Sequence, residues 1–121
     1  MKATANIPLC KAIIETEELK AVENVLKSGW LTHGPKTTEF ENLFAKYLGV
    51  KYALMVNSGS SANLLALSIL TNPLLGNKRI KNNEEIITPA VTWPTTVYPI
   101  SNVGAIPKFV DVTLDDFTIN V

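Results

Sequence analysis

Cysteine and histidine are nearly missing from this sequence, which contains one of each, Cys10 and His33. A single cysteine excludes an internal disulfide, a CxxC redox pair and a cluster of thiolate ligands within the chain. His33 stands in GWLTHGP without a second metal ligand nearby, so a solvated loop residue is the simpler interpretation and no metal site is expected. The low use of cysteine favours a reducing compartment such as the cytoplasm.

An excess of one charge is also lacking, because eleven Lys and Arg residues balance eleven Asp and Glu residues. Without a net field, the chain has no electrostatic preference for nucleic acid or an anionic membrane. No apolar run approaches the roughly 18 residues of a membrane span, and the N-terminal MKATANIPLCK lacks the apolar stretch of a signal peptide. We therefore expect a soluble cytoplasmic protein whose partners are neither nucleic acid nor membrane.

A polar tail is lacking at the C-terminus, where the chain stops at LDDFTINV on an apolar residue. Natural chain ends are usually more polar than this, so a fragment of a longer protein is expected. What is present suits one domain and hardly two, since the length is 121 residues and 46% of them are hydrophobic.

Turn residues and hydrophobic spacing divide the chain into helices and strands. Helices are predicted at residues 16–28, 38–48, 61–70 and 92–102, and buried strands at residues 52–57, 85–88 and 108–112. After two leading helices the order is strand, helix, strand, helix, strand. This order is typical of right-handed crossovers in a parallel sheet, so the fold class is α/β.

Several residues mark the ends of these elements. Thr16 is the expected N-cap of the first helix, and Thr38 with Glu41 matches a capping box for the second. A glycine is expected to end each helix, and the one after the first helix stands in the position of a left-handed C-cap. In the last helix Pro94 suits the first turn, whereas Pro99 is expected to end or kink it.

The stretch NSGSSANLLAL, residues 57–67, raises the first functional hypothesis. If residues 52–57 form a strand, its carboxyl end turns directly into the next helix, and open α/β sheets bind ligands at that edge. Gly59 permits close approach, and the amides of Ser60, Ser61 and Ala62 are expected to be unpaired donors. Those donors and the helix dipole suit a phosphate group. The alternative is that Ser60 or Ser61 merely caps the helix, as serine commonly does.

Other phosphate and nucleophile motifs are lacking. The chain contains neither the P-loop GxxxxGK[ST] nor the dinucleotide fingerprint GxGxxG, and GxSxG is absent as well. Trp93, in TPAVTWPTT after the second predicted strand, lies where a flat ligand can stack on its indole. A tryptophan is more often a core residue, but Thr92, Thr95 and Thr96 make the setting polar. A phosphate site with an aromatic plate indicates a flat phosphorylated ring.

Two long segments carry a resemblance to a known family. The run SGWLTHGPKTTEFENLFAKYLGVKYALMVNSGSSANLLAL, followed by EEIITPAVTWPTTVYPISNVGAIPKFVDV, resembles the DegT/DnrJ/EryC1/StrS family of pyridoxal-phosphate (PLP) enzymes, which act on nucleotide-linked keto sugars. The resemblance runs from about residue 9 to residue 120. GSSANLLAL, the TNPLLGNKRIKNN connection and WPTT look most like the branch that removes the 3-hydroxyl of a CDP-linked 4-keto-6-deoxyhexose. Amination of a keto sugar by an aminotransferase of the same family is the alternative.

The resemblance implies a three-layer α/β/α large domain of fold-type I PLP enzymes, of which residues 1–121 are the N-terminal portion without an internal domain boundary. Gly59, Ser60 and Ser61 correspond to the phosphate-binding turn, and Trp93 to the residue that stacks on the pyridine ring of pyridoxal 5'-phosphate or pyridoxamine 5'-phosphate. The resemblance also implies a homodimer, a nucleotide-sugar substrate and a role in deoxysugar or lipopolysaccharide biosynthesis. The first strand is expected at one sheet edge and the next two at the other, so this chain alone should not fold stably.

The family's catalytic residues lie beyond Val121 according to the same resemblance, so no catalytic residue is assigned in this chain. The carboxylate that pairs with the pyridine nitrogen belongs to a later motif, and Asp111 is given a structural or neighbouring role. The lysine that binds the cofactor also comes later, and a histidine replaces it in the dehydratase branch. The family places the His33 loop near the active-site entrance. Two rival hypotheses are a truncated, non-catalytic remnant and a small α/β module for another phosphate compound.

Overall fold

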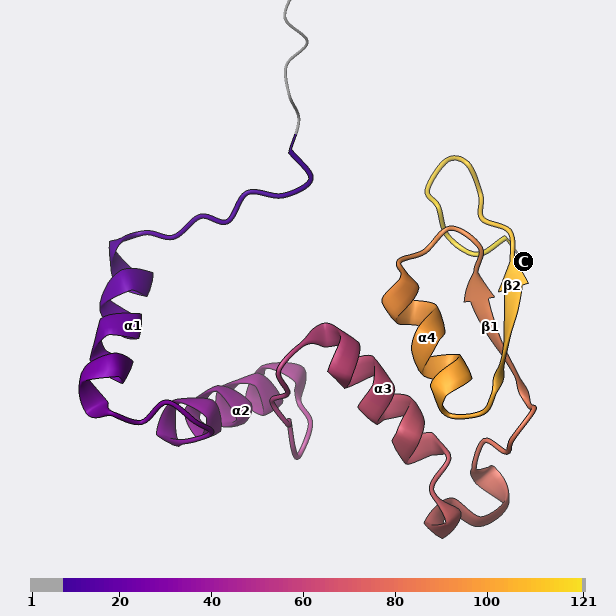
Figure 1. Ribbon diagram of the computed structural model, residues 1–121, viewed down its shortest axis with the longest axis horizontal. Coiled ribbons are helices and arrows are strands. Elements are labelled where there is room, and N and C mark those ends of the chain that lie inside the picture. The colour runs from indigo at the N-terminus through magenta and orange to yellow at the C-terminus, as the bar shows by residue number, and fades with distance from the viewer. Residues whose placement is uncertain (1–7, 121) are drawn as a thin grey trace, which may run out of the picture. The chain divides into compact units, whose positions relative to one another are not determined.

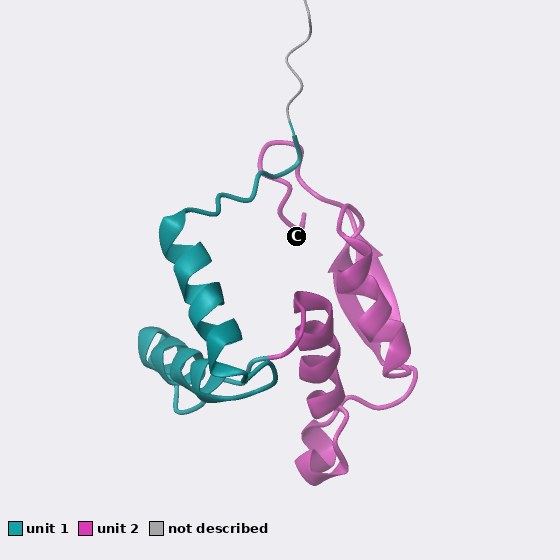
Figure 2. Ribbon diagram, turned by 60° about the vertical axis from the view of Figure 1, so that its left-hand side comes forward, with its two compact units in different colours: residues 1–55 teal, residues 56–121 magenta. Residues whose placement is uncertain are grey.

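The computed structural model describes residues 8–120 (Figure 1). The chain divides into two compact units, Met1–Met55 and Val56–Val121, which Figure 2 shows in different colours. The first unit is helical, and the second holds the sheet.

The first unit begins with α1, Thr16–Ser28. Its N-cap is Glu15 rather than the predicted Thr16, because the Glu15 amide donates to Glu18 Oε2 at 2.9 Å and the Glu15 side chain accepts from the third residue of the helix. This is a reciprocal capping box with a glutamate in the place of the usual serine or threonine. Gly29 ends the helix in the left-handed conformation, with φ of 70°, as predicted.

The second helix, α2, is Pro35–Leu48, so its predicted start at Thr38 is wrong by three residues. Gly34 is the N-cap and Pro35 the first helical residue, where the fixed φ of proline suits a helix and its missing N–H is not needed. The capping box predicted for Thr38 and Glu41 is therefore not formed. The helix ends at Gly49 as predicted, and Gly49 is in the left-handed conformation.

The predicted strand at residues 52–57 is also wrong, since these residues have no strand pairing in the described part of the chain. The segment is extended and exposes apolar side chains, with Tyr52 at 77% and Leu54 at 70%. A strand requires a partner for its amides and carbonyls. The apolar side chains of residues 52–57 suit a buried strand, but no other segment within residues 8–120 pairs with them as a neighbouring strand.

The second unit contains α3, η1, β1, α4 and β2: Gly59–Leu70, Pro73–Lys78, Glu85–Pro89, Pro94–Asn102 and Ile106–Val110. The predicted connection at 71–83 thus contains a 3₁₀ segment, and α3 starts two residues earlier than expected. β1 and β2 pair in parallel, with Glu85 opposite Ile106 and Pro89 opposite Val110. The predicted parallel pairing with an intervening helix is confirmed (Figure 1).

The strand boundaries shift by one or two residues. β1 includes Pro89, and β2 begins at Ile106 rather than at the predicted residue 108. Pro107 is tolerated because each strand of this two-stranded sheet has an open edge that needs no amide. Val112, predicted to end this strand, instead forms an isolated antiparallel bridge with Ile119.

Pro99 lies inside α4 instead of ending it. Proline cannot donate to the carbonyl four residues earlier, which here belongs to Thr95. The side-chain amide of Asn63 on α3 donates to that carbonyl, with an N–O distance of 3.3 Å. The neighbouring helix thus replaces the donor that the proline removes, and the two helices pack together.

Few apolar side chains are buried in the described residues. Within residues 8–120 the buried hydrophobic residues are Ala45, Ile100, Ala105 and Val112, three of them in the second unit. The hydroxyl of Thr88 on β1 is also buried and has no hydrogen-bond partner among the described residues. Native proteins rarely leave such a group unsatisfied. The described residues therefore do not complete a core.

Candidate functional site: the N-terminal end of α3

Ser58 caps α3 with both its side chain and its carbonyl. Its Oγ accepts from the Ser61 amide at 3.2 Å, and its carbonyl oxygen accepts from the Ala62 amide at 3.0 Å. The prediction of unpaired amides is therefore wrong for Ser61 and Ala62. The capping residue is Ser58, so the alternative that Ser60 or Ser61 caps the helix is wrong as well.

Two donors remain at this helix end. In the described part of the chain, the amides of Gly59 and Ser60 have no hydrogen-bond acceptor. A Cβ built on Gly59 would meet nothing within 4 Å, so the space beside its backbone is open. Gly59 is not left-handed, and the fold therefore does not require glycine there for conformational reasons. Free amides, an open approach and a positive helix end together suit an anionic group.

A pocket of about 240 Å³ lies between α3 and α4. It contains two of the sequence-predicted site residues, Ser60 and Ser61, on its α3 side. The complete lining is Ser60, Ser61, Leu64, Thr95, Tyr98, Pro99 and Asn102. The pocket thus joins the phosphate-turn serines to the helix that follows Trp93.

Trp93 is the N-cap of α4 and does not line that pocket. Its indole is 68% exposed, so within the described residues it is not a core side chain. The Trp93 carbonyl accepts from the Thr96 amide at 2.9 Å, and Thr92 Oγ1 donates to Thr96 Oγ1 at 3.0 Å. The backbone that carries the indole is therefore held at a helix start, four residues after the carboxyl end of β1.

Asp111 has a local structural role, as expected. Its Oδ1 accepts from the amide of Val112 at 2.8 Å, and its carbonyl accepts from the amide of Asn120 at 2.9 Å. The second of these bonds connects the residue after β2 to Asn120. The carboxylate is thereby engaged with its own backbone.

Glu41, which the sequence predicted as part of a capping box, has a different role that the sequence did not indicate. Its Oε1 accepts from the amide of Met55 at 2.8 Å, and Nε2 of His33 lies 3.5 Å from the same oxygen. The Met55 amide, and to a lesser degree His33, lower the pKa of Glu41 below its ordinary value. His33 is thus an ion-pair partner when protonated rather than only a solvated loop residue. Its contact with Glu41 joins the 29–34 loop to α2.

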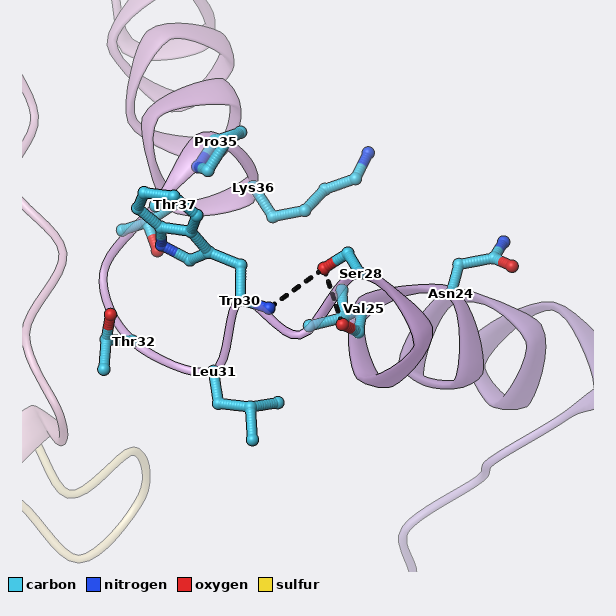
Figure 3. Close-up of a pocket in the computed structure, with 10 residues that line it drawn as sticks. Asn24, Val25, Ser28, Trp30, Leu31, Thr32, Pro35, Lys36 and Thr37 are labelled. Carbon is cyan, nitrogen blue, oxygen red and sulfur yellow. Dashed lines mark hydrogen bonds between the residues drawn. The ribbon is translucent and has the colours of Figure 1, made fainter.

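A larger pocket, of about 460 Å³, lies in the first unit around Trp30. Figure 3 shows the Trp30 ring beside the start of α2, near Pro35 and Thr37. The Trp30 indole N–H donates to the carbonyl of His33 at 3.0 Å, and its amide donates to Ser28 Oγ at 3.2 Å. The loop of residues 29–34 is therefore ordered by its own side chains, which the glycine and proline pattern did not indicate.

The parallel strands, the helix between them and the serine-rich helix start define part of an α/β domain with two free amides at a helix end. Comparison with known proteins is consistent with that class. The model of the DegT/DnrJ/EryC1/StrS aminotransferase family matches residues 12–121. The chain belongs to this family.

Similar proteins include both dehydratases and aminotransferases. GDP-4-keto-6-deoxy-D-mannose 3-dehydratase of Escherichia coli O55:H7 (strain CB9615 / EPEC) is 41% identical over 96% of this chain and 29% of that protein. UDP-4-amino-4-deoxy-L-arabinose–oxoglutarate aminotransferase of Shewanella sediminis (strain HAW-EB3) is 36% identical over 95% of this chain and 28% of that protein. The dehydratase name specifies GDP, whereas the sequence resemblance indicated a CDP-linked sugar.

A solved structure agrees with the fold assignment. The E. coli GDP-4-keto-6-deoxy-D-mannose-3-dehydratase with bound hydrated PLP superposes with a TM-score of 0.84 at 42% identity, covering 95% of this chain and 29% of that one. The predicted fold class, part of a fold-type I PLP enzyme, is confirmed. The chain spans about 29% of the length of these dehydratases. Within the described residues, none of the helices is both long and apolar enough to cross a membrane.

Proposed function

We propose that this chain supplies the cofactor-phosphate turn of a PLP- or pyridoxamine-phosphate-dependent enzyme that removes the 3-hydroxyl of a nucleotide-linked 4-keto-6-deoxy sugar. The observation that carries the proposal is the open helix start at Gly59 and Ser60, within a family of PLP enzymes. The 3-dehydratases among the relatives favour dehydration and a role in deoxysugar or lipopolysaccharide biosynthesis. A homodimer and a cytoplasmic location are parts of the same proposal.

Gly59, Ser60 and Ser61 would hold the cofactor phosphate. The amides of Gly59 and Ser60 are available as donors, and the hydroxyls of Ser60 and Ser61 add further hydrogen bonds. The Ser61 amide is already bonded to Ser58 Oγ, so its contribution comes from its hydroxyl. The missing Cβ of Gly59 leaves the room that a phosphate oxygen needs to approach the backbone.

Trp93 would bind the flat face of the pyridine ring. Its exposed indole follows the carboxyl end of β1, the edge where open α/β sheets bind ligands. When bound, the cofactor supplies an electron sink that makes a carbon–hydrogen or carbon–oxygen bond of the substrate labile. The role of this chain is to bind and orient that group, and the residue that moves the proton is expected beyond residue 121.

An aminotransferase of the same family is the second candidate, since a sugar aminotransferase is 36% identical to this chain. The two functions differ in the residue downstream of this chain that faces the cofactor: a lysine favours amino transfer, and a histidine favours dehydration. Sequencing the reading frame beyond Val121 separates them. An immediate stop codon would instead favour the non-catalytic remnant.

The cofactor site is tested in the full-length protein by two substitutions, Gly59→Ala and Trp93→Ala. Both variants are expected to lose pyridoxal phosphate on dialysis about tenfold more readily than the wild type, as followed by near-ultraviolet and visible absorbance. A lost charge-assisted hydrogen bond or ring stack is worth about 1.5 kcal/mol, which corresponds to roughly that factor.

The control is the free energy of unfolding of each apoprotein, which shows whether a variant loses cofactor because its fold is weakened. Because a Cβ on Gly59 meets nothing within 4 Å, Gly59→Ala should leave its free energy of unfolding unchanged or slightly raised. Loss of cofactor at undiminished stability means that the open space serves a ligand. A colourless wild type that ignores added pyridoxal phosphate would overturn the proposal, and undiminished retention in Trp93→Ala would remove Trp93 from the site.

A further inference from the structure

One carboxylate oxygen on α2, Oε1 of Glu41, connects three segments of the first unit. It accepts from the Met55 amide at 2.8 Å and lies 3.5 Å from Nε2 of His33. The side chain of Glu41 is 15% exposed, whereas that of His33 is 60% exposed. The bond to Met55 is the shorter of the two contacts. Because His33 is exposed, its pair with Glu41 is largely screened by water.

The Met55 bond holds a segment that has little else to hold it. In the described part of the chain, it is the one hydrogen bond that residues 52–57 donate. The side chains on both sides of Met55 do not compensate, since Leu54 is 70% exposed and Val56 is only partly buried. Among the described residues, removal of this bond would leave the segment without a hydrogen-bonded backbone amide.

We propose that Glu41 is a positioning residue, which fixes the backbone at Met55 and thereby supports cofactor retention at the turn that begins three residues later. The inference rests on the proposed function for the cofactor and adds to it a residue outside the turn. A charge-assisted bond to a backbone amide is about twice as strong as a neutral one, which suits a carboxylate for this role. The effect passes along the covalent chain from Met55 to Ser58, the cap of α3.

Glutamine separates the two contacts of Glu41. In Glu41→Gln the side-chain oxygen can still accept from the Met55 amide, but the charge that pairs with His33 is gone. Glu41→Asp keeps the charge and withdraws the oxygen by one methylene, and Glu41→Ala removes both contacts. Glu39→Gln is the matched control, because Glu39 lies on the same helix and pairs locally with Lys36 at 2.6 Å.

The experiment uses the full-length protein and two measurements. Hydrogen exchange of the Met55 amide reports the anchor directly, with or without cofactor. Dialysis followed by absorbance reports the retention of pyridoxal phosphate, well below the midpoint of thermal unfolding. We expect Glu41→Ala and Glu41→Asp to accelerate exchange at Met55 and to raise the dissociation constant of pyridoxal phosphate about tenfold. Glu41→Gln, whose neutral oxygen accepts a weaker bond from the Met55 amide, should lie between Glu41→Ala and the wild type, and Glu39→Gln should remain within about twofold of the wild type.

Each contrary outcome overturns a defined part of the inference. Unchanged Met55 exchange in both Glu41→Ala and Glu41→Asp overturns the anchor. Faster exchange with unchanged cofactor retention overturns the link to the cofactor. A Glu41→Gln variant that behaves like Glu41→Ala overturns the hydrogen-bond account in favour of the His33 pair. A wild type that takes up no pyridoxal phosphate overturns the proposed function and the cofactor link, while Met55 exchange still decides the anchor.

Discussion

The backbone amides at the start of α3 differ in whether they are hydrogen-bonded. Ser58 uses its hydroxyl and its carbonyl to satisfy the amides of Ser61 and Ala62, which fixes the first turn. Gly59 and Ser60 leave their amides free within the described residues. The cap thus satisfies two amides at the helix start, and two others remain free among the described residues. The proposed phosphate site depends on this division, because the cap fixes the turn while the free amides stay available as donors.

Glu18 gives a residue-scale prediction about pH. Hydrogen bonds from backbone amides, its own and that of Glu15, lower the pKa of Glu18 below 4.5. A lowered pKa in the folded state means that the contribution to stability is fully present above the unfolded value and is lost as the pH falls through the folded value. Glu18→Gln keeps an acceptor for the capping box but carries no charge.

The difference in the free energy of unfolding between wild type and Glu18→Gln should therefore be largest above pH 4.5 and should close as the pH falls further. Urea denaturation of the full-length protein at a series of pH values measures it. Glu17→Gln, in the same turn, leaves the capping box intact and serves as the control. A difference that grows as the pH falls would contradict the lowered pKa.

At the scale of elements, helices in this chain begin and end where local chemistry dictates. Glycine and proline set the start of α2, and left-handed glycines end both α1 and α2. Contacts between elements then satisfy what local chemistry leaves open. Asn63 on α3 donates to the Thr95 carbonyl that Pro99 leaves without a donor on α4. The pocket beside Ser60 and Ser61 is formed at this helix pair.

Gly34 provides a prediction at the junction of α1 and α2. A Cβ at this position would come within 1.9 Å of the indole nitrogen of Trp30. Gly34→Ala must therefore displace the ring and break its hydrogen bond to the His33 carbonyl. We expect the free energy of unfolding of the full-length protein to fall by about 1–3 kcal/mol, measured by urea denaturation.

The double variant with Trp30→Ala provides the control for the clash. Once the ring is removed, the added methyl group meets no indole, so Gly34→Ala should have little further effect in that background. If the effects of the two substitutions simply add, the proximity of Gly34 and Trp30 is not the cause of the loss.

At the scale of the molecule, apolar surface exceeds what residues 8–120 can bury. Leu19, Val22 and Leu26 form the apolar face of α1, and all three remain more than half exposed. On α2 the rings of Phe40, Phe44 and Tyr47 stack in a row, with centroids 5.5 and 6.5 Å apart, yet none of them is buried. Since burial of apolar area is the main favourable term in folding, these faces need further chain or a partner to cover them.

The isolated 121-residue chain is therefore expected to unfold without a cooperative transition. Far-ultraviolet circular dichroism during urea titration measures this, with the full-length protein as the comparison. The full-length protein should show a sigmoidal transition, whereas the isolated chain should lose its helical signal gradually. A sharp transition of the isolated chain would show that residues 1–121 complete their own core.

Much of the local structure and the family could be read from the sequence. The glycine ends of α1 and α2, the position of α3, and the parallel order of β1 and β2 followed from local spacing and turn residues. The start of α3 was predicted because a glycine and several serines precede a leucine-rich run, and its role as a phosphate site stays a prediction. The capping of that turn by Ser58 was less predictable, because several adjacent serines can serve as the cap.

The sequence by itself determined the helices, the parallel strand pair and the family, because these depend on periodicity, caps and contiguous motifs. Only the tertiary structure decided the contacts of Glu41 with Met55 and of Asn63 with Thr95, which are 14 and 32 residues apart. It also decided that residues 52–57 are not a strand here. Hydrogen bonds between distant segments depend on which groups the fold brings together, and a local pattern carries no information about the partner.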